Sequence, residues 1–174
     1  MKRSELRETV FRLLFMRQFN SEEEMKEQVR LYLEGLKEGR EEVPYAERVT
    51  AEDEAAVAEK LSGVLKHIPE IDELLNRTSR GWKTSRMAKV DLSILRLAVY
   101  EMNYDDSVPV GVAINEAVEM AKHYGGADSP SFINGILGKI ARSGSEEEGS
   151  GKTEPAPAET EEQNPKGADP ETAE

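Results

Sequence analysis

The stretch that decides the fold is Met87-Ala-Lys-Val-Asp-Leu-Ser-Ile-Leu-Arg-Leu-Ala-Val-Tyr-Glu-Met-Asn103, within a chain of 174 residues. Its apolar side chains point around most of the circumference of a helix instead of forming one stripe, as in a helix that its neighbours bury on nearly every side. We therefore predict a central helix here. The apolar positions are Val90, Leu92, Ile94, Leu95, Leu97, Ala98, Val99 and Met102.

Amphipathic helices are predicted on both sides of this central one, because apolar residues recur at spacings of three and four. Ser21 with Glu24, and Thr50 with Asp53, have the spacing of a capping box that opens a helix. The other predicted helices are Ser4–Phe19, Ser21–Gly39, Thr50–His67, Pro69–Asn76, Pro109–Tyr124 and Pro130–Arg142, with Arg40–Val49 as a connecting loop. No segment alternates with a period of two, so the sequence predicts an all-α fold, a single compact domain of about seven helices over residues 1–142.

The carboxyl-terminal residues 143–174 differ in composition from the rest. They hold ten acidic residues and two lysines, and they account for −8 of the net charge of −12. From Gly144 onward they contain no aromatic residue, Leu, Ile or Val, so they lack the apolar surface that offsets chain entropy. We predict a disordered acidic tail, whose charge would screen basic surface of the folded part against nonspecific anions.

Several classes of function are disfavoured by composition. The chain has no cysteine, which excludes disulfides, thiol nucleophiles and cysteine-based zinc sites. No secretory signal and no membrane-spanning run is present, so we expect a cytoplasmic protein with no membrane partner. His67 and His123 are predicted near helix ends, far apart in sequence, and no nucleophile and base come together. We expect no enzyme, no metal site and no cofactor.

A binding function has more support than catalysis. The first predicted helix interleaves cations with rings, and Arg3, Arg7, Phe11 and Phe15 follow a spacing of four along one line of its surface. Cations that hold phosphates beside rings that stack on bases suit single-stranded RNA. An amphipathic core helix with solvated arginines explains the same residues. A second candidate is Tyr124–Phe132, whose helix start offers free N–H groups to a phosphate, although an ordinary loop explains it too.

Ordered blocks in the carboxyl half, with one in the first helix, resemble the NusB transcription antitermination factor family, over roughly Leu6–Ile140. The blocks are Arg7-Glu-Thr-Val-Phe-Arg-Leu-Leu-Phe15, Asp91-Leu-Ser-Ile-Leu-Arg-Leu-Ala-Val-Tyr-Glu101, Pro109, Ala113-Ile-Asn-Glu-Ala-Val-Glu-Met-Ala-Lys-His-Tyr-Gly125, Asp128-Ser, and Phe132-Ile-Asn-Gly-Ile-Leu137. The ordered series is specific, whereas any single block is weak.

The resemblance implies a helical, non-enzymatic protein that binds boxA-containing nascent RNA together with the ribosomal protein NusE, as part of the transcription elongation complex. It implies that Lys2, Arg3 and Arg7 meet phosphates. It places four further residues along the RNA path, which are Phe15, Asp128, Ser131 and Phe132. Asp91 matches a position that faces NusE, and we expect it at the exposed edge of its helix.

Two other functions fit the same sequence. One is the related RNA-binding module of ribosomal RNA cytosine methyltransferases, which precedes a catalytic domain that this chain lacks. The other is a helical protein-binding scaffold or homodimer, joined through the central apolar surface, without specific RNA binding. RNA binding at low salt separates the NusB-like function from the scaffold.

Overall fold

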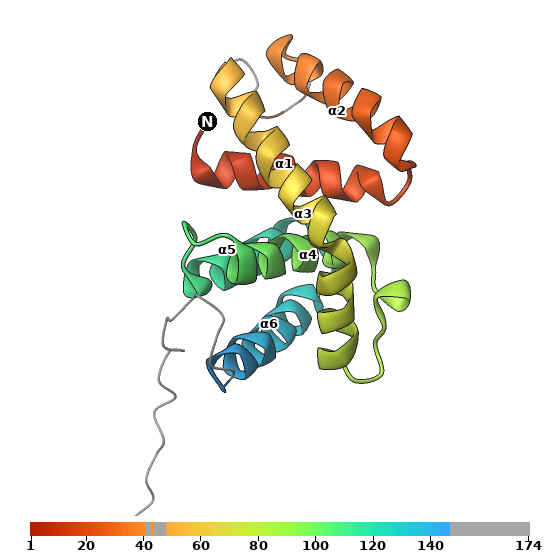
Figure 1. Cartoon of the computed structure of the whole chain (residues 1–174), viewed down its shortest axis with the longest axis vertical. Coiled ribbons are helices and arrows are strands. Elements are labelled where there is room, and N and C mark those ends of the chain that lie inside the picture. The colour runs from red at the N-terminus through yellow and green to blue at the C-terminus, as the bar shows by residue number, and fades with distance from the viewer. Residues whose placement is uncertain (41–42, 44–47, 147–174) are drawn as a thin grey trace, which may run out of the picture.

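The computed structural model describes residues 1–40, 43 and 48–146, and Figure 1 shows how their helices are arranged. The elements are α1 (Arg3–Arg17), α2 (Glu22–Lys37), α3 (Ala51–Thr78), the 3₁₀ helix η2 (Thr84–Arg86), α4 (Lys89–Tyr104), α5 (Val110–Tyr124) and α6 (Ser129–Glu146). Within these residues there is no strand, which confirms the predicted all-α class. About seven helices were expected, and the described part has six α-helices with one short 3₁₀ helix.

The central position predicted for Met87–Asn103 is confirmed, since α4 contacts α1, α3, α5 and α6. Between Asp91 and Met102 only Arg96 and Tyr100 are half-exposed, and every other side chain is buried. Figure 1 shows α1, α2 and the first part of α3 above α4, with α5 beside it and α6 below it. The core therefore surrounds one helix, and the surface is formed by the outer faces of the other five.

Both predicted capping boxes are present. The Ser21 hydroxyl accepts the Glu24 N–H at 3.3 Å, and the Glu24 carboxylate accepts the Ser21 N–H at 2.7 Å. Thr50 and Asp53 make the same reciprocal pair at 3.2 and 2.8 Å, so the shorter acid also reaches back to the cap. These bonds satisfy N–H groups that the first turn of a helix leaves without partners.

The prediction that Pro69 starts a separate short helix is wrong. Residues 51–78 form one helix with Pro69 inside it. Val64, Ile71 and Leu75 stay on one buried face across the proline, and this shared packing holds both halves together although Pro69 lacks an N–H. In Figure 1 the helix runs obliquely and then turns downward, a bend that an internal proline favours.

The ends of two predicted segments also change. The last helix runs to Glu146, so the first four residues that we assigned to the tail are helical. The rest of the predicted disordered tail, from residue 147, lies outside the described residues, as does most of the predicted Arg40–Val49 loop. Among the described residues no helix is both long and apolar enough to cross a membrane.

Candidate RNA-binding interface

The predicted phosphate-binding residues Lys2 and Arg3 are exposed at the start of α1. This end of the helix is fixed in place, because the amino group of Met1 lies 3.1 Å from Asp53 and the Lys2 N–H donates to Glu5 at 2.6 Å. The two cations therefore project from an anchored end.

Arg7 does not share their surface, which corrects the expectation that it meets phosphate. Its side chain is only 5% exposed, and Nε and Nη2 donate to the two carboxylate oxygens of Glu101, each at 2.8 Å. Burial disfavours the charged guanidinium, but hydrogen bonds and charge from Glu101 outweigh it and raise the pKa of Arg7. Because this bidentate pair is closed off from solvent, Arg7 joins α1 to α4 and is not available to a ligand.

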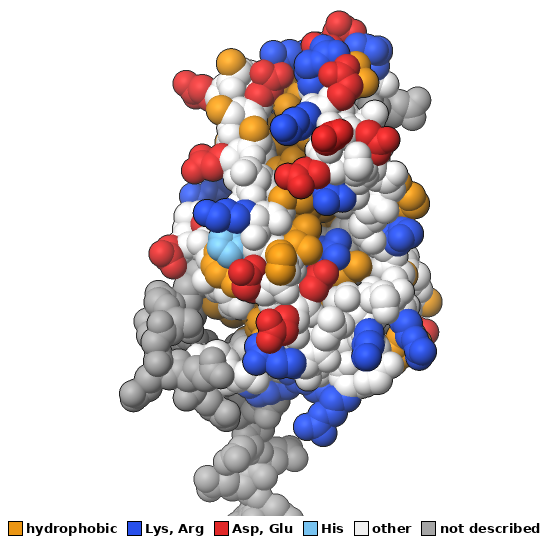
Figure 2. Space-filling view, turned by 45° about the vertical axis from the view of Figure 1, so that its right-hand side comes forward, with side chains coloured by type: hydrophobic (Ala, Val, Ile, Leu, Met, Phe, Trp, Pro, Cys, Tyr) orange, Lys and Arg blue, Asp and Glu red, His pale blue; other side chains and the backbone are white. Residues whose placement is uncertain are grey.

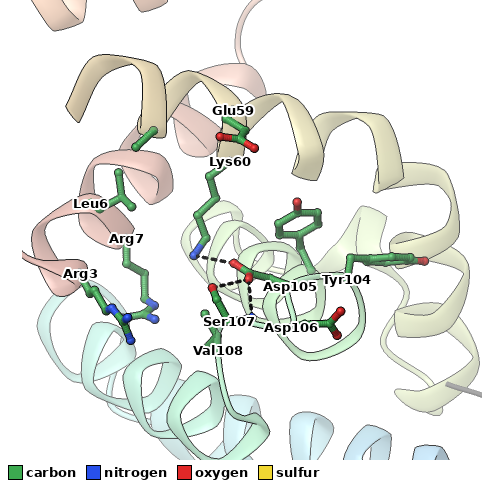
Figure 3. A pocket seen from close by; sticks show the side chains of 12 residues that line it. Arg3, Leu6, Arg7, Glu59, Lys60, Tyr104, Asp105, Asp106, Ser107 and Val108 are labelled. Atoms are coloured by element: carbon green, nitrogen blue, oxygen red, sulfur yellow. Dashed lines mark hydrogen bonds and ion pairs between the residues drawn. The ribbon is translucent and has the colours of Figure 1, made fainter. Parts of the chain in front are cut away.

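Lys60 completes this buried network from α3. Its amino group lies 2.8 Å from Glu101 and 3.5 Å from Asp105, and Asp105 in turn accepts hydrogen bonds from Ser107. Figure 3 shows Arg3 and Arg7 entering from α1 and Lys60 from α3, around a hollow of about 430 Å³. Beside this hollow Arg7, Lys60, Glu101 and Asp105 pair with one another and form a structural ion network that holds the start of α1, while Arg3 at its edge stays exposed.

Phe15 belongs to a row of four rings toward the other end of α1. The ring row consists of Phe11, Phe15, Phe19 and Tyr124. Phe15 lies twelve positions after Arg3, which places it about 18 Å farther along the helix axis. Phe15 lines a surface pocket of about 320 Å³ together with Phe11 and Tyr124, whose rings are 5.0 Å apart. On its other side, the Phe19 ring lies 5.2 Å from Phe15, and the amino group of Lys89 lies 5.3 Å from the Phe19 ring.

Arg12 lies over the Tyr124 ring but is not a free cation. It donates to Glu8 at 3.3 Å and to the Tyr124 hydroxyl at 3.2 Å, and the same hydroxyl donates to Glu8. Burial, followed by the hydrogen bond to Glu8, raises the pKa of Tyr124 above its usual value. The hydrogen bonds among Glu8, Arg12 and Tyr124 fix the end of α5 against α1 and leave Tyr124 36% exposed.

The predicted corner at the start of α6 is present. Asp128 and Ser131 are exposed, and Phe132 is half-buried against Trp82, with ring centroids 6.4 Å apart. Trp82 itself is 57% exposed. The structure thus groups Phe132 with an exposed ring that our sequence reasoning did not select.

The turn that leads into this corner is tightly built. Ser129 is the first residue of α6, and its hydroxyl accepts the Gly126 N–H at 3.0 Å. A Cβ on Gly125 would lie 2.5 Å from the Cβ of Ser129, so only glycine fits there. The turn is therefore closed by internal hydrogen bonds.

Asp91 was expected at an exposed edge, and this prediction is wrong. The residue is only 9% exposed, in the first turn of α4. Its Oδ1 is buried without a hydrogen-bond partner among the described residues. A buried acceptor without a partner carries a free-energy cost, so this oxygen can accept a hydrogen bond that none of the described residues donates.

The sequence reasoning also missed a basic segment, residues 77–89, which runs from the end of α3 through the following loop and η2 to the first residue of α4. It contains Arg77, Arg80, Lys83, Arg86 and Lys89, all exposed. The signal was present in the sequence, since this segment contains five cations and no acidic residue.

Comparison with known proteins decides the family. A family model described as "NusB family" matches residues 4–142. The chain belongs to the NusB family. The transcription antitermination protein NusB of Agathobacter rectalis is 45% identical over 141 residues, which cover 81% of this chain and 100% of the relative. That of Lachnoclostridium phytofermentans is also 45% identical, over 80% of this chain and 98% of the relative.

Solved NusB structures have the same fold. T. maritima NusB is 30% identical with a TM-score of 0.66, over 82% of this chain and 92% of that one. A chain from a structure of antitermination factors NusB and NusE in complex with dsRNA has a TM-score of 0.61, over 82% of this chain and 99% of that one. At 23% identity this second likeness supports the fold alone. The NusB-like architecture predicted from the sequence is thereby confirmed.

Proposed function

We propose that this NusB-family chain is a transcription antitermination factor that binds boxA-containing nascent RNA of ribosomal RNA operons together with NusE, within the transcription elongation complex. The observation that carries the proposal is the NusB family match over residues 4–142, together with relatives named transcription antitermination protein NusB. The factor acts by binding and performs no catalysis. This accords with a surface where cations and half-exposed rings lie on a rigid helical frame.

In this proposal the RNA is held at three places on one strand. Lys2 and Arg3 neutralise phosphates at the start of α1, Phe15 offers a ring in the row with Tyr124 and Phe19, and Phe132 marks the corner at α6. Asp128 and Ser131 are exposed beside Phe132 and offer an acceptor and a hydroxyl to base edges. Single-stranded RNA is suited to this arrangement because its unpaired bases are free to stack on rings.

NusE supplies the missing partner of Asp91 in this proposal. The buried Oδ1 is an acceptor without a donor, and a charged or amide donor from NusE would satisfy it. A pairing of this kind relieves a cost already present in the free chain. RNA binding by the chain alone is then weak and salt-sensitive, and it tightens when two proteins share one strand.

The test is a titration of labelled single-stranded boxA RNA with the full chain at low salt, with and without purified NusE. We expect weak binding by the chain alone and tighter binding with NusE. The double variant Lys2→Glu/Arg3→Glu lowers the magnitude of the salt slope by about 1.4, the value for two phosphates. Lys26→Glu/Lys66→Glu makes the same charge change on the exposed sides of α2 and α3 and serves as the control.

Failure to bind boxA RNA at low salt even with NusE present contradicts the proposed function. It would favour the helical scaffold or homodimer, for which the oligomeric state of the chain in solution is the next measurement.

A further inference from the structure

The basic segment 77–89 is the largest group of cations that the described structure leaves without counter-charges. Its five cations recur at every third position, and none forms an ion pair with another described residue. By contrast, Arg30 on the surface of α2 forms ion pairs with Glu27 and Glu34, each at 2.6 Å, so exposed cations of this protein do pair where acidic residues are nearby. Concentrated positive charge without internal partners attracts a polyanion.

The segment is also held in one conformation. The Thr84 N–H donates to the Asn76 side chain at 2.8 Å, the Trp82 N–H donates to the Ser79 carbonyl at 3.1 Å, and the Ser79 hydroxyl bonds back to α3. Gly81 turns the chain with a φ of 84°. Because the loop is pre-organised, a ligand that binds it loses little chain entropy.

Trp82, the single tryptophan of the chain, projects from this loop with 57% of its side chain exposed. An indole so exposed adds little to folding, and among the described residues its one ring contact is an edge contact with Phe132. Exposed aromatic rings among cations are the elements that bind single-stranded nucleic acid, where each stacked base contributes about 1–3 kcal/mol.

The segment is continuous with the interface already described. Phe132 lies against Trp82 at one side, and Lys89 at the other end lies against Phe19 of the ring row. In Figure 2 Lys and Arg side chains predominate over the lower part of the face, whereas both signs of charge mix over the upper part.

We propose that the basic segment 77–89 is a second RNA-binding track, which takes the phosphates of unpaired RNA outside boxA while Trp82 stacks on one of its bases. The proposal rests on the proposed function, because it assumes a strand already held near Phe132. The proposed ligand of the segment is single-stranded RNA. The alternative ligand is an acidic protein segment, and the experiment below distinguishes the two.

The experiment compares two RNAs in complex with the full chain and NusE: boxA alone, and boxA extended by unpaired nucleotides at both ends. Wild type binds the extended RNA more tightly, with a salt slope larger in magnitude. Lys83→Glu/Arg86→Glu loses that gain and lowers the slope by about 1.4, while its affinity for boxA alone stays within about twofold. The control Lys26→Glu/Lys66→Glu keeps the gain.

Trp82 fluorescence gives an independent signal, since no other residue of this chain contributes tryptophan emission and the complex with Trp82→Ala gives any contribution of NusE. We expect quenching by the extended RNA, loss of the affinity gain in Trp82→Ala, and retention of most of it in Trp82→Phe. The proposal is overturned if the extension adds no affinity, if the gain survives Lys83→Glu/Arg86→Glu, or if the fluorescence responds only to NusE. Those results leave the proposed function standing, whereas failure to bind boxA alone removes both.

Discussion

Three of the four arginines of α1, which are Arg7, Arg12 and Arg17, have hydrogen-bond partners inside the fold, whereas the cations of the basic segment 77–89 have none among the described residues. Arg7 is buried against Glu101, Arg12 is shared between Glu8 and Tyr124, and Arg17 donates to the Asn20 carbonyl at 2.9 Å. The segment has no such partners among the described residues. The difference teaches that internal acceptors decide whether a cation holds the fold or is free to bind a ligand.

The largest expected effect is a loss of stability when the buried ion network that holds α1 is broken. Glu101→Gln removes the counter-charge that Arg7 and Lys60 share and leaves them only the longer contacts, Arg7 with Glu116 at 3.6 Å and Lys60 with Asp105 at 3.5 Å. Breaking the buried network in this way costs about 3–5 kcal/mol of unfolding free energy. Urea denaturation measures it. Asp106→Asn makes the same chemical change at an exposed position nearby and stays within about 0.5 kcal/mol of wild type. Equal stabilities of the two variants would show that the ion network does not hold α1.

A second pair of variants separates structural cations from ligand-binding ones. Arg7→Met lowers the unfolding free energy by about 2–4 kcal/mol, less than Glu101→Gln because Glu101 keeps Lys60, and it leaves the RNA salt slope unchanged. Arg86→Met leaves stability within about 0.5 kcal/mol and lowers the salt slope of binding to the extended boxA RNA by about 0.7. Urea unfolding and RNA titration of the same two proteins give both quantities. A change in the salt slope of RNA binding in Arg7→Met would show that Arg7 contacts RNA after all.

Much of the fold could be predicted because the helix periodicity and capping boxes of the sequence agree with the helices and buried faces of the structure. The all-round apolar pattern from Val90 to Met102 marked the buried helix, and the Ser21 and Thr50 boxes marked two helix starts. Pro69 misled because its local preference for a first turn was overridden by packing of the apolar face that continues across it. Tertiary contacts of that kind are not visible in a window of a few residues.

The site was less predictable, since it depends on pairs far apart in the chain. Arg7 and Glu101 are separated by 94 positions, so no local pattern could show that this arginine is buried. Asp91 was misplaced for the related reason that helix periodicity does not tell how closely a neighbour covers the first turn. The basic segment could have been found, because its lack of nearby acids is a local property.

Acid should affect the two regions differently. Burial alone would raise the pKa of Asp105, but hydrogen bonds from Ser107 and the charge of Lys60 outweigh it and hold that pKa below its ordinary value. A group with a depressed folded pKa contributes stability above its unfolded pKa, about 3.9, and loses it as the pH falls through the folded value. Below pH 4 the unfolding free energy of wild type therefore falls more steeply than that of Asp105→Asn.

Urea unfolding at several pH values between 2.5 and 6 checks this, and parallel curves for the two proteins would contradict it. The basic segment contains no carboxylate, so Arg86→Met serves as the control and follows the wild-type slope.

The smallest expected effect concerns the acidic tail, which would compete with RNA for the free cations. Truncation after Glu146 keeps α6 whole and removes nine acidic residues and two lysines. We expect nonspecific single-stranded RNA to bind more tightly at low salt, with the difference fading as the Debye length shortens from about 30 Å at 0.01 M salt to 3 Å at 1 M. A full-length chain with the tail acids changed to Gln or Asn separates charge from length: it should match the truncated chain if screening is electrostatic. Unchanged affinity in both variants would leave the tail no role at this surface, and the free cations of residues 77–89 would then be unopposed in the intact protein.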